Sequence, residues 1–193
     1  MPSETLPHVE DRDGRKALVV GDYVQSIAVE DDHPFDVWDA FIPRHRLPWR
    51  VLILGAGGGT IATLLTQRCG PIRIVAIERD PAVARLAREE FGLIHLDNVE
   101  LIEADAFTWI ETCTEAFDLI CVDMYVAGEI AHGTLATPFL RQIAALLTPG
   151  GIAAFNLFSS KRITEQLHRL ARVFNIVERI PIGGNVVVHV MRD

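Results

Sequence analysis

The stretch 51–65 constrains the fold of this chain more than any other. Residues 51–54 are all apolar, four of the next five residues are glycine, and a helical pattern begins at Thr60. An uninterrupted apolar run predicts a strand buried on both faces. Glycine lets another group approach the backbone, and the first N–H groups of a helix are free. This strand, turn and helix therefore predict a site for a polar, nucleotide-like ligand.

The glycine spacing leaves three interpretations open. A dinucleotide fold places a third small residue, Gly or Ala, where this chain has Thr60. The alternative spacing Gly55-x-Gly57-x-Gly59 is that of adenosylmethionine-dependent transferases. In the third interpretation, the glycines only form a tight turn.

Composition narrows the class of protein and of ligand. Of the 193 residues, 49% are apolar and 23% are charged, which suits one domain with a large core. The formal net charge of −8 argues against a nucleic-acid partner and is compatible with a cationic substrate. Cys69, Cys113 and Cys121 lack metal-ligand spacing, and we expect no bound metal.

Residues 1–16 lack the apolar stretch of a signal peptide. No run of about eighteen apolar residues occurs in the sequence, so no membrane span is predicted. We therefore expect a cytoplasmic protein without a membrane partner.

The N-terminal residues predict a small β unit. Residues 1–15 are polar and are expected to form a loose lead-in, while 17–20 and 23–29 predict a β-hairpin. An exposed strand edge invites pairing with another chain, so a homodimer is one expectation.

A short helix is expected after this hairpin. The acidic run 30–32 ends the hairpin, and the helix spans about 34–41 before Pro43 stops it. We therefore divide the chain into residues 1–48, which hold the lead-in, hairpin and short helix, and a main domain at 49–193 that contains the predicted ligand site.

Strand-like and helix-like segments alternate in the larger domain, which is typical of a parallel sheet with helices on both faces. Strands are expected at 51–54, 73–77, 99–102, 117–122, 152–157, 176–180 and 186–191. Helices are expected from Thr60, Pro81, Thr137 and about Lys161, with a short one around Trp109. We also expect a loop at 124–136, a sharp turn at 148–151, and antiparallel pairing of the last two strands.

Three carboxylates fall where an open α/β sheet binds its ligand, beyond the carboxyl ends of the strands. Glu78, Asp105 and Asp123 each end or follow an expected strand. Glu78 can accept both hydroxyl protons of a ribose. Asp105 can accept an adenine amino proton, with the Ala106 N–H donating to a ring nitrogen. The alternatives are a solvated carboxylate at Glu78 and a helix N-cap at Asp105.

Several ordered segments resemble the motifs of class I adenosylmethionine-dependent methyltransferases, and more narrowly those of spermidine synthases and spermidine-synthase-like proteins. They are 55–59 (GAGGG), 77–80 (IERD), 103–106 (EADA), 117–123 (FDLICVD), 147–151 (LTPGG) and the N-terminal 20–26 (VGDYVQS). The resemblance implies a Rossmann-like α/β fold. Its sheet is mostly parallel and seven-stranded, with an antiparallel last strand, and a short β-hairpin precedes it.

The resemblance implies S-adenosylmethionine or its decarboxylated form as cofactor. The cofactor-binding residues that it implies are Gly55, Ala56, Gly57, Gly59, Glu78, Arg79, Asp105, Ala106 and Asp123. Glu78 would bind the ribose, Asp105 the adenine end, and the glycine loop the amino-acid or aminopropyl portion.

Asp123 is the expected catalytic residue, because it matches the carboxylate with which aminopropyltransferases take a proton from the attacking amine. A primary amine has a pKa near about 10, so at neutral pH it is mostly protonated and lacks a free lone pair. A nearby carboxylate can bind this cation and accept its proton. The alternative role is cofactor positioning alone.

Three positions depart from the spermidine synthase pattern. Val126 stands where a second Asp is usual, Gly58 replaces an Asp of the glycine loop, and 35–37 (FDV) replaces a Tyr-His-Glu stretch that grips the diamine. The diamine grip is therefore largely missing. Gln25 matches a family position near the substrate, and Tyr125 is a second candidate for the acceptor pocket.

The leading hypothesis is a transferase that moves an aminopropyl or methyl group to a small acceptor, with an amine as one candidate. The alternative is a non-catalytic nucleoside-binding or oligomerisation module of the same fold. A third hypothesis, NAD binding, fits the glycines but neither Thr60 nor the Pro-Gly-Gly turn.

Overall fold

The structure is a computed structural model that describes residues 6–30 and 34–192. Two residues of the acidic run, 31 and 32, lie outside the described residues. Among the helices that are described, none is long and apolar enough to cross a membrane.

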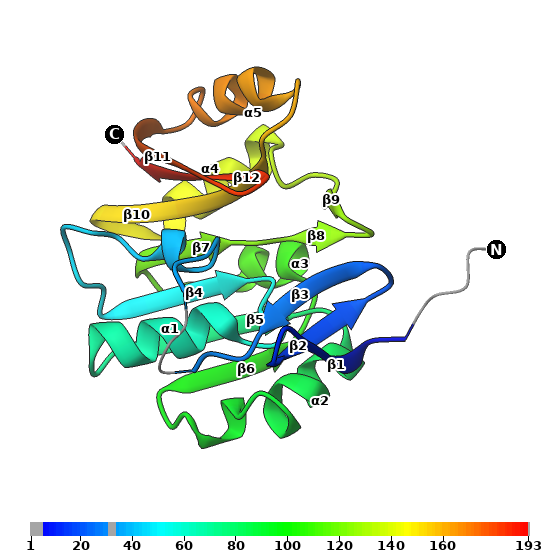
Figure 1. Cartoon of the computed structure of the whole chain (residues 1–193). Helices are drawn as coiled ribbons and strands as arrows, with labels where there is room; N and C mark the ends of the chain where they lie inside the picture. Colours follow the sequence, from blue (N-terminus) through cyan, green and yellow to red (C-terminus); the bar gives the residue numbers. More distant parts are fainter. Residues whose placement is uncertain (1–5, 31–33, 193) are drawn as a thin grey trace.

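A seven-stranded sheet forms the centre of the molecule (Figure 1), with the strand order β11-β12-β10-β7-β4-β5-β6. Its strands are β4 (Arg50–Leu54), β5 (Arg73–Glu78), β6 (Val99–Glu103), β7 (Phe117–Val122), β10 (Leu147–Phe158), β11 (Asn175–Ile182) and β12 (Asn185–Met191). Neighbours are parallel except at β12, which is antiparallel to β10 and β11. This confirms the expected mostly parallel sheet with its antiparallel last strand.

Helices cover both faces of the sheet. They are α1 (Thr60–Cys69), α2 (Pro81–Glu89), α3 (Ala106–Thr112), α4 (Thr137–Leu146) and α5 (Ile163–Leu170), with the 3₁₀ turns η1 (Asp39–Phe41) and η2 (Leu93–His95). One core includes η1, α1, Val51 and Ile53, whereas the other includes α3, α4, α5 and Leu52 and Leu54. Successive strand residues point to opposite faces, so residues 51–54 of β4 are all apolar because both faces of the strand are buried there.

The strand order reverses beside β4. From β4 the chain proceeds to β5 and β6 on one side, and it then crosses to β7 and β10 on the other. Loops that follow β4 and β7 diverge at such a point and leave a crevice at the carboxyl ends of the strands. The glycine loop, residues 55–59, lies there.

An N-terminal antiparallel sheet lies at the carboxyl ends of β4 and β5, as Figure 1 shows in blue. It contains β1 (His8–Arg12), β2 (Arg15–Val20) and β3 (Tyr23–Ile27). The expected hairpin is confirmed as β2 and β3. The prediction of a loose lead-in was wrong for residues 8–12, because they form β1, which pairs with β2 along its whole length. Polar residues can form this strand because its side chains are exposed or only partly buried.

Hydrogen bonds fasten β3 to the glycine loop and to the start of α1. The Gly58 N–H donates to the buried Ser26 hydroxyl at 2.7 Å, and the Thr60 hydroxyl donates to the Ile27 carbonyl at 2.8 Å. A Cβ at Gly58 would lie 2.8 Å from the Ser26 Cβ. Gly58 therefore departs from the family pattern for a local reason, since Ser26 occupies the space that an Asp would need.

Three further expectations need correction. Residues 34–41 form only the short turn η1, because long-range bonds from Asp39 and Ala40 hold this segment. The loop 124–136 contains a small hairpin of β8 (Tyr125–Val126) and β9 (Glu129–Ile130). The turn at 148–151 lies within β10, which continues through the Pro-Gly-Gly residues by shifting its register on β7.

Candidate active site

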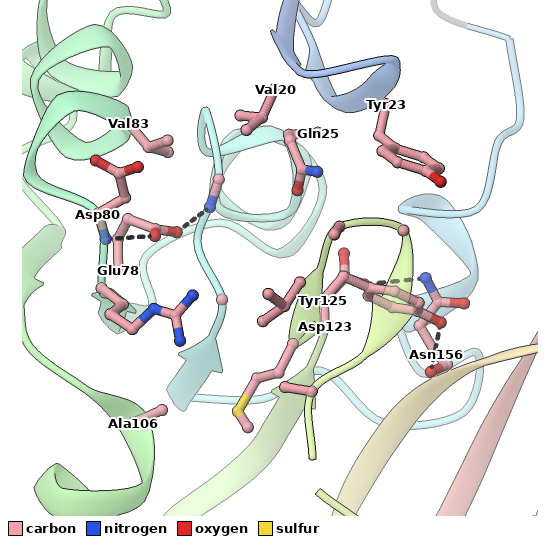
Figure 2. Close-up of a pocket in the computed structure, with 18 of the residues that line it drawn as sticks. Val20, Tyr23, Gln25, Glu78, Asp80, Val83, Ala106, Asp123, Tyr125 and Asn156 are labelled. Atoms are coloured by element: carbon pink, nitrogen blue, oxygen red, sulfur yellow. Dashed lines mark hydrogen bonds between the residues drawn. The ribbon is translucent and has the colours of Figure 1, made fainter. Parts of the chain in front are cut away.

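A cavity of about 460 Å³ opens at the carboxyl ends of β4, β5 and β7 (Figure 2). That volume falls within the range of small-molecule sites, about 300–1,000 Å³. The sequence-predicted residues that line it are Gly55, Gly57, Glu78, Arg79, Asp105, Ala106, Asp123, Gln25 and Tyr125. Ala56 and Gly59 do not. Ala56 is buried in the core beside α1, and a Cβ at Gly59 would meet the Leu93 side chain at 2.0 Å.

Two glycines shape the floor of the cavity. Gly55 has a φ of +86°, and a Cβ there would lie 2.2 Å from the Asp123 carbonyl oxygen. Gly57 has a φ of +53°, and a Cβ there would lie 2.8 Å from the Ser26 hydroxyl. Positive φ and these close approaches both require glycine, so the loop can run beside β3 and β7 only without side chains at these positions.

Every backbone N–H of the glycine loop has an acceptor within the chain. Gly55 and Ala56 donate to the Ile77 carbonyl, and Gly59 donates to the Ala56 carbonyl. Gly57 donates to the Glu78 carboxylate at 2.9 Å, and Gly58 to Ser26. No backbone donor of this loop is left over for an anionic group of a ligand.

Glu78 ends β5 and lines the cavity on the same side as Asp80 and Ala106 (Figure 2). Its two carboxylate oxygens accept the N–H groups of Gly57 and Asp80, each at 2.9 Å. Burial raises the pKa of Glu78, although these backbone donors oppose the shift. A carboxylate has about four acceptor positions, so Glu78 retains capacity for a ligand hydroxyl.

Asp105 lies at the next strand end and serves two purposes. Its Oδ1 accepts the Thr108 N–H at 3.1 Å, so it is the N-cap of α3, as the alternative interpretation proposed. Asp105 also lines the cavity, as does the buried Ala106 that begins α3.

Asp123 follows β7 on the opposite side of the glycine loop from Glu78. Its N–H donates to the Leu54 carbonyl at 2.9 Å, which continues the pairing of β7 with β4. Its Oδ1 accepts the Asn156 amide at 2.9 Å, and the Trp38 side chain is a second donor. Burial nevertheless raises the pKa of Asp123 to about 6. A general base with a pKa near the working pH suits proton transfer.

Asn156 links Asp123 to the last strand of the sheet. Its Oδ1 accepts the Asn185 amide at 2.7 Å, and its carbonyl accepts the Tyr125 hydroxyl at 3.0 Å. Because Oδ1 is engaged by an N–H donor, the Asn156 amide group must present its own N–H to Asp123. The chain Asn185–Asn156–Asp123 therefore fixes the direction of the Asp123 carboxylate.

Sequence reasoning missed Trp38, Asn156, Asn185, Tyr23 and Phe158, all of which line the cavity. One signal was available, because Asn156 is the single polar residue in the apolar run 152–158. Trp38 and Asn185 carried no local signal, since only tertiary contacts bring Trp38 to Asp123 and Asn185 to Asn156.

The lining carries a strong negative charge. Its carboxylates are Asp22, Glu78, Asp80, Asp105 and Asp123, and Arg79 is the single guanidinium among the described lining residues. A concave site with this imbalance favours a cationic ligand.

Strand order, glycine loop and the carboxylates at two strand ends together define a class I methyltransferase fold with a nucleoside-type site. Consistent with this, the family model described as a methyltransferase domain matches residues 51–151. The chain therefore belongs to the methyltransferase-domain family, and among its relatives it resembles spermidine-synthase-like proteins. The family implies binding of S-adenosylmethionine or a close derivative.

Similar proteins include both aminopropyltransferases and methyltransferases. Polyamine aminopropyltransferase 2 of Hyperthermus butylicus is 28% identical over 176 residues, which cover 84% of this chain and 57% of that protein. The crystal structure of a probable spermidine synthase from Corynebacterium glutamicum superposes with a TM-score of 0.83 and 21% identity, over 96% of this chain and 76% of that chain. The crystal structure of human methyltransferase-like protein 13 in complex with SAH gives a TM-score of 0.69 and 22% identity, over 76% of this chain and 72% of that chain.

The chain spans about half the length of the first aminopropyltransferase relatives that it matches. The two structural likenesses concern the fold. Together with the family match, the sequence relatives indicate an enzyme of the adenosylmethionine-dependent transferase kind. The alternative of a non-catalytic module finds no support among them.

Proposed function

We propose that this chain is an alkyltransferase that moves an aminopropyl group from decarboxylated S-adenosylmethionine to a small amine. The observation that carries the proposal is that Glu78 and Asp123 line one cavity from opposite sides of the glycine loop. A base for the acceptor and a ribose ligand for the cofactor are thus within one site.

The lining residues fit a sulfonium nucleoside. Glu78 would accept the ribose hydroxyls, Asp105 and Ala106 would meet the adenine, and Gly55 and Gly57 leave the loop open to the chain on the sulfur. Arg79 and Asp80 border the ribose end. The five carboxylates favour the positive sulfonium.

The glycine loop favours the decarboxylated form over S-adenosylmethionine itself. A cofactor carboxylate at this loop would need free donors, yet all five loop N–H groups are already engaged. It would also face a predominantly anionic wall. The decarboxylated cofactor lacks this carboxylate and ends in an ammonium group. The same anionic wall therefore attracts it.

Bound in this site, the cofactor supplies an alkyl group on a positively charged sulfur. The chain contributes by preparing the acceptor. Asp123 binds the ammonium form of the amine and then accepts its proton, which frees the nitrogen lone pair. The Asn156 amide and the Trp38 side chain stabilise the ionised carboxylate beforehand, so Asp123 is charged at neutral pH despite its burial.

Methyl transfer is the second candidate, and the family match over residues 51–151 favours it. Calorimetry with both cofactors separates the two versions. We expect the decarboxylated form to bind at least tenfold more tightly, and mass spectrometry to show an added aminopropyl group on an amine. Tight binding of the carboxylated form alone would exclude aminopropyl transfer.

Glu78→Gln provides an independent test of the cofactor site. Hydrogen bonds to a charged group are worth about 1.5–3 kcal/mol, so we expect cofactor affinity to fall roughly 10- to 100-fold. Glu100→Gln, at the exposed second position of β6, is the matched control and should leave affinity unchanged. If Glu78→Gln binds the cofactor as the wild type does, the ribose assignment is wrong.

A further inference from the structure

The cavity has two chemically different ends. In Figure 2, Glu78, Asp80 and Ala106 lie on one side, and Asp123, Tyr125 and Asn156 lie on the other. The first group contains two carboxylates, those of Glu78 and Asp80. The second group, here called the acceptor end, consists of Asp123 and the side chains bonded to or packed on its partners, which are Trp38, Tyr125, Asn156, Phe158 and Asn185.

Asp123 is the only carboxylate of the acceptor end so defined. The polar atoms around it are engaged with one another, since the Asn185 amide bonds Asn156 and the Tyr125 hydroxyl bonds the Asn156 carbonyl. Asp22, which also lines the cavity, is exposed in the turn between β2 and β3 and is therefore well solvated. A ligand can place one ammonium on Asp123, but the described residues that line this end offer no further buried carboxylate for a second ammonium.

The remaining surface of this end is aromatic and apolar. Tyr125 and Phe158 meet edge to face, with their ring centroids 5.0 Å apart and their planes at 75°. Val126 follows Tyr125 in β8 and also lines the cavity. Aromatic faces attract a single organic cation, and apolar walls accept a hydrocarbon body without desolvating a polar group.

The small hairpin of β8 and β9 closes this end against β3. Gly128 lies in its two-residue turn, and a Cβ there would be 2.2 Å from the ring of Tyr23. Tyr23 and Gly128 both line the cavity. The ring of Tyr23 therefore extends the aromatic wall across from Tyr125, on the side opposite the sheet (Figure 2).

We propose that the acceptor is a monoamine, a primary amine with one cationic centre and an apolar or aromatic body, rather than a diamine or polyamine. This inference rests on the proposed function. The amine gives its proton to Asp123, and its nitrogen forms a bond to the propyl carbon next to sulfur. The carbon–sulfur bond breaks, and its electron pair converts the sulfonium to a neutral thioether. The product is a secondary amine.

Three acceptors test the inference, and two of them, pentylamine and 1,4-diaminobutane, are matched in length. With decarboxylated S-adenosylmethionine, kcat/KM is measured for pentylamine, 2-phenylethylamine and 1,4-diaminobutane, with products identified by mass spectrometry. We expect each monoamine to exceed the diamine at least tenfold. A diamine that reacts as well as or better than the monoamines overturns the proposal.

Val126→Asp sharpens the test, because it adds a carboxylate to the acceptor end three residues after Asp123. We expect it to shift the ratio of kcat/KM values at least tenfold toward the diamine. Val126→Asn introduces a side chain of nearly the same size as that of aspartate but without its charge. It should leave the ratio close to that of the wild type. An unchanged ratio in Val126→Asp would mean that the acceptor lies elsewhere.

Binding measurements separate the two levels of the argument. If neither cofactor binds or no amine reacts, the proposed function fails. Calorimetric titration of the same three amines into the protein then still measures whether the acceptor end binds monoamines or the diamine more tightly. Tighter binding of the monoamines supports the inference, and tighter or equal binding of the diamine contradicts it.

Discussion

The two ends of β7 hold carboxylates that the fold treats in opposite ways. Asp118 is the second residue of the strand, and Asp123 follows its last residue. Each would have its pKa raised by burial alone, yet the pKa of Asp118 is lowered and that of Asp123 is raised to about 6. The same strand thus holds a carboxylate of lowered pKa at one end and a carboxylate of raised pKa at the other.

The difference lies in the number of donors. Asp118 accepts the backbone N–H groups of Trp49 and Arg50 at 3.0 and 3.1 Å and the Thr148 hydroxyl at 2.9 Å, with Arg46 nearby. These bonds join β7 to the entrance of β4 and to β10. Among the described residues, the donors to the Asp123 carboxylate are the Asn156 amide and the Trp38 side chain. A carboxylate with few donors keeps the basicity that proton transfer requires.

The largest expected effect is on kcat, which should distinguish a substitution of Asp123 from one of Asp118. Asp123→Asn removes the base, and we expect kcat to fall about 10²- to 10⁴-fold, as is typical for loss of acid–base catalysis. Cofactor affinity, measured by calorimetry, should change little. Asp118→Asn is the matched control and should keep nearly full activity. Equal loss in both variants would mean that Asp123 acts through the fold rather than in the reaction.

The pH dependence should run in opposite directions for activity and stability. Asp123 must be ionised to act, so kcat/KM should fall tenfold per pH unit below about 6. An unfolded Asp titrates near about 3.9, so between about pH 4 and 6 the folded state binds more protons at Asp123. Its contribution to the free energy of unfolding therefore falls by about 1.4 kcal/mol per unit as pH rises through that window.

Urea unfolding of the wild type and of Asp123→Asn at pH 4.5 and 6.5 measures this term, because other groups cancel in the difference. The stability difference between the two proteins should change in favour of the variant at the higher pH. Asp118 behaves in the opposite sense, since its contribution is complete above about pH 4 and is lost as pH falls through its lowered pKa. If the stability difference between the wild type and Asp123→Asn does not vary with pH, the proposed contrast between Asp118 and Asp123 is wrong.

A smaller effect concerns stability at neutral pH. Asp118→Asn replaces charge-assisted hydrogen bonds by neutral ones, and we expect the free energy of unfolding to drop by about 1 kcal/mol. Chemical denaturation at pH 7 measures it. Asp11→Asn, in the exposed strand β1, controls for loss of one negative charge. The comparison loses its basis if Asp118→Asn is as stable as the wild type.

The smallest effect tests the hydrogen-bond chain behind Asp123. Asn185→Ala frees the Asn156 Oδ1, so the Asn156 amide is no longer held with its N–H toward Asp123. We expect the acid limb of kcat/KM to move up by less than one pH unit, with little change at pH 8. Asn98→Ala, which removes an unrelated bond to Thr66, should leave the limb in place. A purely structural role for Asn185 would lower the rate equally at every pH.

The sequence by itself determined the parts of this protein that depend on local patterns. The apolar run 51–54, the glycines after it and the alternation of periodicities predicted the parallel sheet, and strand ends placed Glu78, Asp105 and Asp123 at one edge. These predictions succeed because a strand buried on both faces must be apolar, and because parallel strands present their carboxyl ends together.

Only the tertiary structure decided how the site is completed. Ser26 engages Gly58, Trp38 donates to Asp123, and Asn185 holds the Asn156 amide that bonds Asp123, each from a segment far away in the chain. Such contacts leave no periodic trace, because they depend on one side chain meeting another across folded elements rather than on neighbours in sequence. For the same reason the basicity of Asp123 and the loss of free donors in the glycine loop become visible only after the N-terminal sheet and the last strands have packed around β4 and β7.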